Sequence, residues 1–236
     1  MHRTSDSPTT PAEASRSKQS ILNLPNQLTI ARLVLSVVFF VLLALENHLA
    51  LENRGKLFNT FGQVKMNLML NVSMVVFILA VITDFLDGYL ARKWKLTSTF
   101  GRIADPFADK VVICGAFIML TGVTPRLVEP WFAVVIVCRE FLVSGLRSFL
   151  ESRGVAFGAA FSGKLKMLVQ SITIPLVIFY QANLEPAAGQ ARSGISAAFY
   201  WLTIAFLGLT LLLTVTSSFD YVRRAIQLIR TNDKED

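Results

Sequence analysis

The sequence predicts an all-α, polytopic membrane protein with six transmembrane helices. Of its 236 residues, 53% are hydrophobic and only 17% are charged, whereas a soluble globular domain carries about 25% charged residues. The mean hydropathy is +0.53. Several apolar runs also reach the roughly 20 residues that a helix needs to cross a bilayer. Composition and run length together therefore exclude an ordinary soluble domain.

Six apolar runs can each form a spanning helix, and an even number of spans places both chain termini on the same side of the membrane. Two cysteines, Cys114 and Cys138, lie inside these runs without ligand spacing, so we expect both to be small buried apolar side chains. The predicted spans cover residues 28–49, 68–90, 103–123, 128–149, 163–181 and 196–216.

The segments outside the spans predict the topology. Residues 1–19 are rich in Ser, Thr and Pro and are expected to be a disordered tail, residues 20–222 form the membrane domain, and residues 223–236 form a charged tail. Lys and Arg are more numerous on the side of both termini, which marks that side as cytoplasmic. The net charge of +7 then suits anionic lipid and requires no nucleic acid partner. A bacterial inner membrane fits best.

Two pairs of acidic residues lie close together in the sequence. Asp84 and Asp87 are three residues apart and Asp105 and Asp109 are four apart, so each pair occupies one face of a helix. Two adjacent antiparallel helices can present all four carboxylates to one point near the cytoplasmic interface. Residues with small side chains, which allow close approach of a ligand or a facing helix, share these faces: Gly88, Ala91 and Gly101.

Four neighbouring carboxylates require positive charge, because they repel one another and are costly to desolvate. Their oxygens suit hard cations, so we expect two Mg²⁺ or Mn²⁺ ions. One alternative is that the acids pair with nearby Lys and Arg at the membrane edge. Others are a cation-coupled transporter, although its acids would lie near the midplane, and a noncatalytic scaffold that binds anionic lipid.

The pattern D-x2-D-G-x2-A-R-x8-G-x3-D-x3-D, from Asp84 to Asp109, resembles the signature of the CDP-alcohol phosphatidyltransferases. This resemblance implies metal-dependent transfer of a phosphatidyl group from CDP-diacylglycerol to an alcohol. It implies that Asp84, Asp87 and Asp105 are metal ligands and that Asp109 is a ligand or the general base. The positions implied to bind the CDP-lipid are Asn26, Thr29, Gly88, Ala91, Arg92, Ser98 and Gly101.

A second resemblance concerns the acceptor alcohol. Residues 139–147 and 163–170 are similar to the phosphatidylglycerophosphate synthase branch of the family, whose acceptor is sn-glycerol 3-phosphate. Basic side chains at one end of two spans could bind its phosphate, or they could be positive-inside anchors. Serine, inositol phosphate and phosphatidylglycerol remain alternative acceptors, and many relatives form homodimers. The predicted acceptor-phosphate residues are Arg139, Ser144, Arg147, Lys164 and Lys166.

Overall fold

The computed structural model describes residues 24–52, 60–94, 99–153, 161–186 and 190–232. Within these residues the chain forms six helices and no strand, which confirms the all-α prediction. The backbone of residues 87–94 and 99–106 is helical, but their side chains lie outside the described part. The helices are α2 (Leu24–Glu52), α3 (Thr60–Trp94), α4 (Thr99–Val123), α5 (Pro130–Ser152), α6 (Phe161–Asn183) and α7 (Gly194–Asn232).

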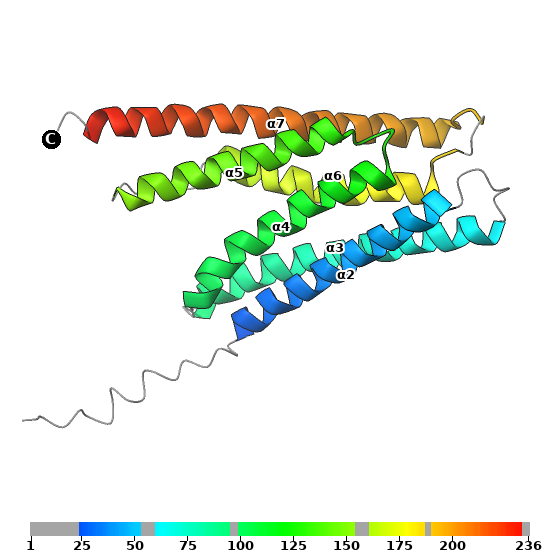
Figure 1. Cartoon of the computed structure of the whole chain (residues 1–236), viewed down its shortest axis with the longest axis horizontal. Coiled ribbons are helices and arrows are strands. Elements are labelled where there is room, and N and C mark those ends of the chain that lie inside the picture. The colour runs from blue at the N-terminus through cyan, green and yellow to red at the C-terminus, as the bar shows by residue number, and fades with distance from the viewer. Residues whose placement is uncertain (1–23, 53–59, 95–98, 154–160, 187–189, 233–236) are drawn as a thin grey trace, which may run out of the picture.

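The helices run back and forth along one axis, so that α2 begins and α7 ends at the same end of the molecule (Figure 1). Within the described residues, four segments are both long and apolar enough to cross a membrane, namely Gln27–Leu51, Val64–Leu86, Gly163–Asn183 and Gly194–Leu228. Helices α4 and α5, of 25 and 23 residues, also have the length to cross, but they carry charged residues within their apolar runs. The molecule is therefore a multi-pass membrane protein whose helices are compatible with six spans.

Two groups of three helices make up the bundle. Helix α2 packs mainly against α3 and α4, while α7 packs against α6 and α5; contacts of α3 with α6 and of α4 with α5 join the groups. Figure 1 shows the first group below the second, with α4 crossing obliquely between them. The site described below lies where α4 meets the second group.

Aromatic and aliphatic side chains fill the half of the bundle away from the chain termini. Phe39 of α2 packs on Phe77 of α3 with ring centroids 5.3 Å apart, and Phe117 of α4 packs on Phe132 of α5 at 5.5 Å. Large apolar side chains also cover the outer surface; Val37, for example, is 60% exposed. An apolar exterior is what a lipid environment favours, because polar and charged side chains are costly to place in hydrocarbon.

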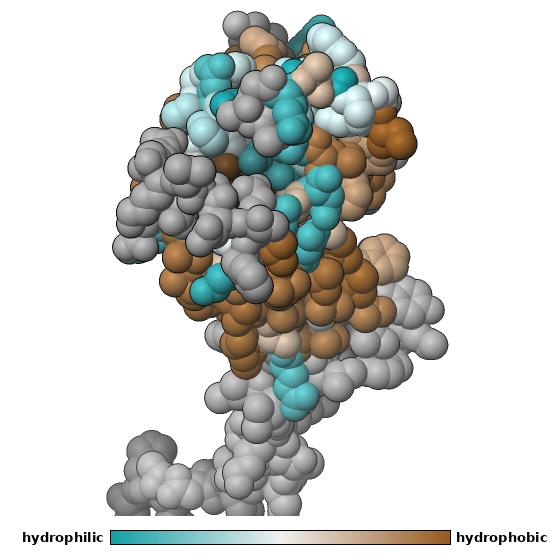
Figure 2. Space-filling view, turned by 90° about the vertical axis from the view of Figure 1, so that its right-hand side faces the viewer, coloured by the Kyte–Doolittle hydropathy of each residue, from teal (hydrophilic) through white to brown (hydrophobic). Residues whose placement is uncertain are grey.

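Figure 2 faces the end at which α6 connects to α7, and it shows hydrophilic side chains gathered in the upper part with an apolar flank below. Trp131 and Trp201 lie near this end at the starts of α5 and α7, and both are more than half exposed. Exposed tryptophans at helix ends are typical of a membrane interface. The position of these aromatic residues agrees with the predicted membrane boundary.

Two expectations differ from the structure. Helix α7 continues to Asn232 rather than ending near Thr216, because Tyr221 and Ala225 remain buried against the bundle and extend its packed face. Cys114 is buried as expected, but Cys138 is exposed and that prediction was wrong. The neighbouring Arg139 takes the inward face of α5, which turns Cys138 towards the outside.

Candidate active site

A single arginine joins two of the four predicted metal-binding aspartates. The Arg32 guanidinium donates to the Asp84 carboxylate and to the Asp109 carboxylate, each over 2.7 Å. Arg32 is almost fully buried, whereas the side chains of Asp84 and Asp109 are 37% and 27% exposed. We call Arg32, Asp84 and Asp109 the carboxylate cluster, and it lies where α2, α3 and α4 meet.

The inner face of α2 explains how Arg32 reaches this position. Thr29, Arg32 and Ser36 are buried and follow one another at the spacing of one helix face, and they continue into the apolar core at Phe39. The Ser36 hydroxyl donates to the Arg32 carbonyl oxygen at 2.7 Å. Polar residues therefore occupy the buried face of α2 at its first turns, beside the carboxylates, and again at Glu46 near the other end of the helix.

The donor set of this cluster suits a hard cation. Asp84 and Asp109 both pair with Arg32, which is the ion pairing that the sequence left open as an alternative; carboxylate oxygens are also the ligands that Mg²⁺ and Mn²⁺ prefer. Asp87 and Asp105 stand one helical turn from Asp84 and Asp109 on α3 and α4, with side chains outside the described part. Among the described side chains no three metal-binding groups come together, so the four-aspartate site stays a prediction.

Most of the predicted CDP-lipid residues have side chains outside the described part of the chain. Thr29 is buried on α2 one turn before Arg32, which puts it beside the carboxylate cluster. Ser98 lies outside the described residues. The other predicted residues lie on described helices, but nothing about their side chains or surroundings is described. These residues are Asn26, Gly88, Ala91, Arg92 and Gly101.

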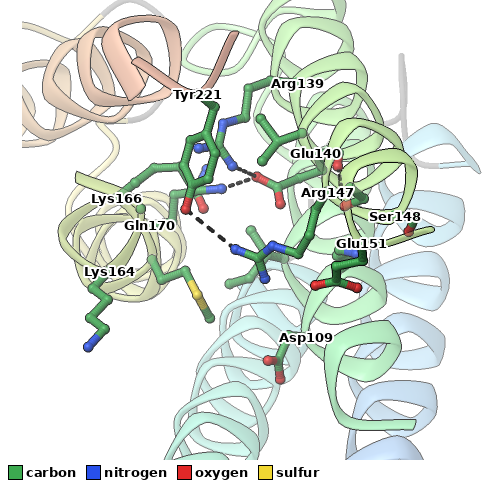
Figure 3. A pocket seen from close by; sticks show the side chains of 16 residues that line it. Asp109, Arg139, Glu140, Arg147, Ser148, Glu151, Lys164, Lys166, Gln170 and Tyr221 are labelled. Carbon is green, nitrogen blue, oxygen red and sulfur yellow. Dashed lines mark hydrogen bonds and ion pairs between the residues drawn. The ribbon is translucent and has the colours of Figure 1, made fainter. Parts of the chain in front are cut away.

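A cavity of about 700 Å³ opens between α4, α5, α6 and α7 (Figure 3). All five predicted acceptor-phosphate residues line it together with Asp109. Among the side chains that the structure describes, five basic and three acidic ones line the space, which gives them a formal excess of two positive charges. We call it the cationic cavity, and its charged lining residues are Asp109, Lys110, Arg139, Glu140, Arg147, Glu151, Lys164 and Lys166.

An ion-pair network occupies the inner part of this cavity. Glu140 accepts from Arg139 at 3.0 Å and from the ammonium group of Lys166, and all three side chains are largely buried. Arg139 also donates to the Ser217 hydroxyl at 2.9 Å and lies 5.7 Å from the centre of the Tyr221 ring. The positive charges of Arg139 and Lys166 are therefore held in place by protein groups.

Arg147 and Lys164 are the less committed cations. Arg147 makes one long contact of 3.5 Å to the Tyr221 hydroxyl, and its Nε atom has no partner among the described residues. Lys164 is exposed beside the opening. Ser144 donates its hydroxyl to the Glu140 carbonyl oxygen at 2.6 Å, so its role as a phosphate donor stays a prediction. Arg147 and Lys164, together with the half-buried lining residue Lys110, are thus placed to meet an anion.

Several residues in contact with the site were not predicted; Glu140 and Tyr221 line the cavity, and Ser217 contacts the lining residue Arg139. Glu140 lies within the predicted acceptor segment 139–147, but a carboxylate repels phosphate and so was not expected in a phosphate site. Ser217 and Tyr221 come from α7, and they lie 78 and 74 residues from the arginines they contact. Their side chains gave no signal, because a serine and a tyrosine near a membrane interface are common.

Asp109 belongs to both parts of the site. A small cavity of about 30 Å³ is lined by Arg32, Asp84 and Asp109, and it shares Asp109, Ile113 and Met167 with the cationic cavity. One face of Asp109 thus meets the carboxylate cluster and the other meets the space lined by cations. A group bound in the cavity can approach this carboxylate, which is the geometry that a general base needs.

Comparison with known proteins gives a consistent result. A sequence profile described as CDP-alcohol phosphatidyltransferase matches residues 22–216. A protein of Bacillus subtilis named CDP-diacylglycerol–glycerol-3-phosphate 3-phosphatidyltransferase is 31% identical over 90% of this chain and all of its own length. Proteins with the same name from Cereibacter sphaeroides and Mycoplasma pneumoniae are 32% and 36% identical, over 67% and 77% of this chain and 83% and 77% of theirs.

Proposed function

Because the chain belongs to the CDP-alcohol phosphatidyltransferase family, we propose that it transfers a phosphatidyl group from CDP-diacylglycerol to sn-glycerol 3-phosphate. The products are phosphatidylglycerophosphate and CMP. The observation that carries this proposal is the position of Asp109 between the carboxylate cluster and a cavity with two excess positive charges. The names of the relatives support the same substrates.

The reaction is a displacement at phosphorus. The C1 hydroxyl oxygen of glycerol 3-phosphate attacks the phosphorus atom that carries diacylglycerol, and the bond from that phosphorus to the bridging oxygen of the diphosphate breaks. CMP leaves with that oxygen, and Asp109 takes the hydroxyl proton. An ordinary carboxylate is a weak base, so proton transfer occurs late, as the attacking hydroxyl becomes acidic.

The cationic cavity supplies the acceptor site. A phosphate monoester carries close to two negative charges near neutral pH, which matches the excess of two positive charges in the lining. Arg147 and Lys164 contact the phosphate directly, while Arg139, Lys166 and Ser144 shape the inner wall. A neutral acceptor such as inositol would leave these cations without a counter-ion, which is costly in a partly desolvated site.

Divalent cations belong to the same proposal. Asp84, Asp87, Asp105 and Asp109 would hold one or two Mg²⁺ or Mn²⁺ ions, supported by the convergence of Asp84 and Asp109 on one positive group. When bound, such ions screen the diphosphate and stabilise the departing phosphate of CMP. Asn26, Thr29, Gly88, Ala91, Arg92, Ser98 and Gly101 would contact the CDP-lipid.

The proposed setting is a bacterial inner membrane with the site at the cytoplasmic surface. The excess of Lys and Arg on the side of the termini supports this orientation, and the cationic cavity lies towards that same end, since the end of α5 and the start of α6 line it. A second copy of the chain is a further candidate partner. Accessibility of single introduced cysteines in 223–236 to a membrane-impermeant reagent, from either side of sealed vesicles, tests the orientation.

The function is tested by measuring CMP release from purified protein with CDP-diacylglycerol and Mg²⁺. The acceptor panel contains glycerol 3-phosphate, serine, inositol phosphate and phosphatidylglycerol, and a parallel series contains excess EDTA. We expect release that requires glycerol 3-phosphate and stops with EDTA. Release driven by a different acceptor would retain the transferase and reject the acceptor, whereas no release from folded protein would reject the transfer reaction itself.

A further inference from the structure

The inner end of the cationic cavity contains one uncharged polar side chain that no group in the described part of the chain satisfies. Gln170 is fully buried on α6, and both its amide nitrogen and its amide oxygen lack a hydrogen-bond partner among the described residues. It lines the cavity one helical turn beyond Lys166. A buried amide without partners costs free energy, so its retention at a cavity wall indicates a ligand that completes it.

The other uncharged polar groups of the cavity are already committed or lie at its opening. Ser144 donates its hydroxyl to the backbone of Glu140, and the Tyr221 hydroxyl accepts from Arg147. Ser148 is exposed, towards the end of α5. Gln170 therefore combines full burial with an unused donor and an unused acceptor.

The proposed acceptor has one polar group, its C2 hydroxyl, to which no partner has yet been assigned. Glycerol 3-phosphate carries a phosphate, an attacking C1 hydroxyl and a C2 hydroxyl. The uncommitted cations suit the phosphate, and Asp109 suits the C1 hydroxyl. A hydroxyl both donates and accepts a hydrogen bond, as a primary amide does, and neither group is charged. Figure 3 shows Gln170 beside Lys166 and apart from Asp109, so Gln170 can contact a different hydroxyl from the one that reacts.

We propose that Gln170 binds the C2 hydroxyl of the acceptor and makes the enzyme selective for a three-carbon phosphate that bears it. This inference rests on the proposed function and adds a specificity-determining residue to it. An acceptor without the C2 hydroxyl leaves the Gln170 amide buried and unpaired. Sites built to hydrogen-bond a substrate hydroxyl reject analogues that lack it for this reason.

The test compares two acceptors in two proteins. The acceptors are glycerol 3-phosphate and 3-hydroxypropyl phosphate, which keeps the phosphate and the attacking hydroxyl but lacks the C2 hydroxyl. In the wild-type protein we expect kcat/KM for glycerol 3-phosphate to be at least about tenfold higher. In Gln170→Leu we expect that ratio to fall to within about threefold of unity, chiefly through loss of activity with glycerol 3-phosphate.

Thr173→Val is the matched control. Thr173 is fully buried on the same helix, hydrogen-bonds Thr210 at 2.8 Å, and does not line the cavity. Removing its hydroxyl should leave the ratio between the two acceptors unchanged. Gln170→Met, which keeps an unbranched side chain of similar length, replaces Gln170→Leu if the leucine variant does not fold.

Two results would overturn the inference while leaving the transferase intact. The first is a wild-type protein that uses both acceptors equally well, which requires no variant at all. The second is a Gln170 variant that loses activity equally with both acceptors, because Gln170 then supports the fold or binds water rather than the C2 hydroxyl. Absence of CMP release with either acceptor in the wild-type protein would instead reject the proposed function.

Discussion

The carboxylate cluster and the cationic cavity each gather side chains of like charge around one side chain of opposite charge. In the first, Arg32 lies between Asp84 and Asp109; in the second, Glu140 lies between Arg139 and Lys166. Each group of like charges thus contains one residue of the other sign, because several like charges cannot be desolvated together without compensation. The difference is in exposure: both aspartates are partly exposed, whereas Arg139 and Lys166 are buried.

This difference assigns different tasks to the two regions. Partly exposed carboxylates can exchange their positive partner, which suits ligands that arrive and leave. The buried pairs around Glu140 hold a fixed wall, and the adaptable cations Arg147 and Lys164 lie outside it. Four substitutions separate these tasks, and they are ordered below by the size of the expected effect.

The largest effect should follow from Asp109→Asn, because Asp109 is shared by both regions. An amide can keep the shape but cannot take a proton, so we expect kcat to fall about a thousandfold or more. CMP release measures this, with Asp220→Asn as the control, since Asp220 is an exposed acid outside both regions. Activity of Asp109→Asn within a few-fold of wild type would contradict its role as the base.

A large loss of stability should follow from Glu140→Gln. Removing the shared partner of Arg139 and Lys166 leaves two buried cations without their carboxylate, which costs about 3–5 kcal/mol. The double variant Glu140→Gln/Lys166→Met should recover part of this loss, because it removes one of the stranded charges. The Tm of both variants in detergent measures these losses. A Glu140→Gln protein as stable as wild type would show that the ion-pair network does not stabilise the cavity wall.

Arg147→Gln should weaken acceptor binding without strongly affecting the chemical step. Loss of one charge-assisted contact to phosphate should raise KM for glycerol 3-phosphate by about ten- to a hundredfold, with kcat changed less. Arg153→Gln is the matched control, because Arg153 follows the same helix and stacks on Phe149 at 4.7 Å outside the cavity. Equal KM values for the two variants would remove Arg147 from the phosphate site.

The smallest effect should come from Arg32→Met, because the exposed parts of Asp84 and Asp109 can regain water. In EDTA we expect this variant to be less stable by about 1–2 kcal/mol. Added Mg²⁺ should then raise its Tm more than that of wild type, since the metal no longer shares the carboxylates with a guanidinium. Thermal unfolding with and without Mg²⁺ reads this out independently of activity, and an equal Mg²⁺ shift in both proteins would contradict it.

The sequence predicted the two regions unequally. The four aspartates lie on two consecutive helices, so spacing alone predicts which face each occupies, and the structure brings Asp84 and Asp109 together. Arg32 is 77 residues from Asp109, and only the packing of α2 against α3 and α4 makes it their common partner. Helix periodicity predicts faces, but it does not predict which faces meet.

The cationic cavity depends more heavily on tertiary packing. Arg139, Arg147 and Lys166 were predictable, because charges inside apolar runs are costly and therefore informative. Ser217 and Tyr221 were not, since they lie on the part of α7 beyond the predicted span. The basic residues Arg223 and Arg224 suggested a solvated tail, yet buried Tyr221 and Ala225 keep that segment helical against the bundle.

The most direct test of the whole account is whether one acceptor molecule enters lipid for each CMP released. Purified protein would be given CDP-diacylglycerol, Mg²⁺ and labelled glycerol 3-phosphate, and both CMP and lipid-extractable label would be counted. We predict a one-to-one ratio, with both products absent in EDTA. CMP released without label in the lipid would mean that water rather than the cavity's ligand attacks the phosphorus, and it would contradict the joint use of the carboxylate cluster and the cationic cavity.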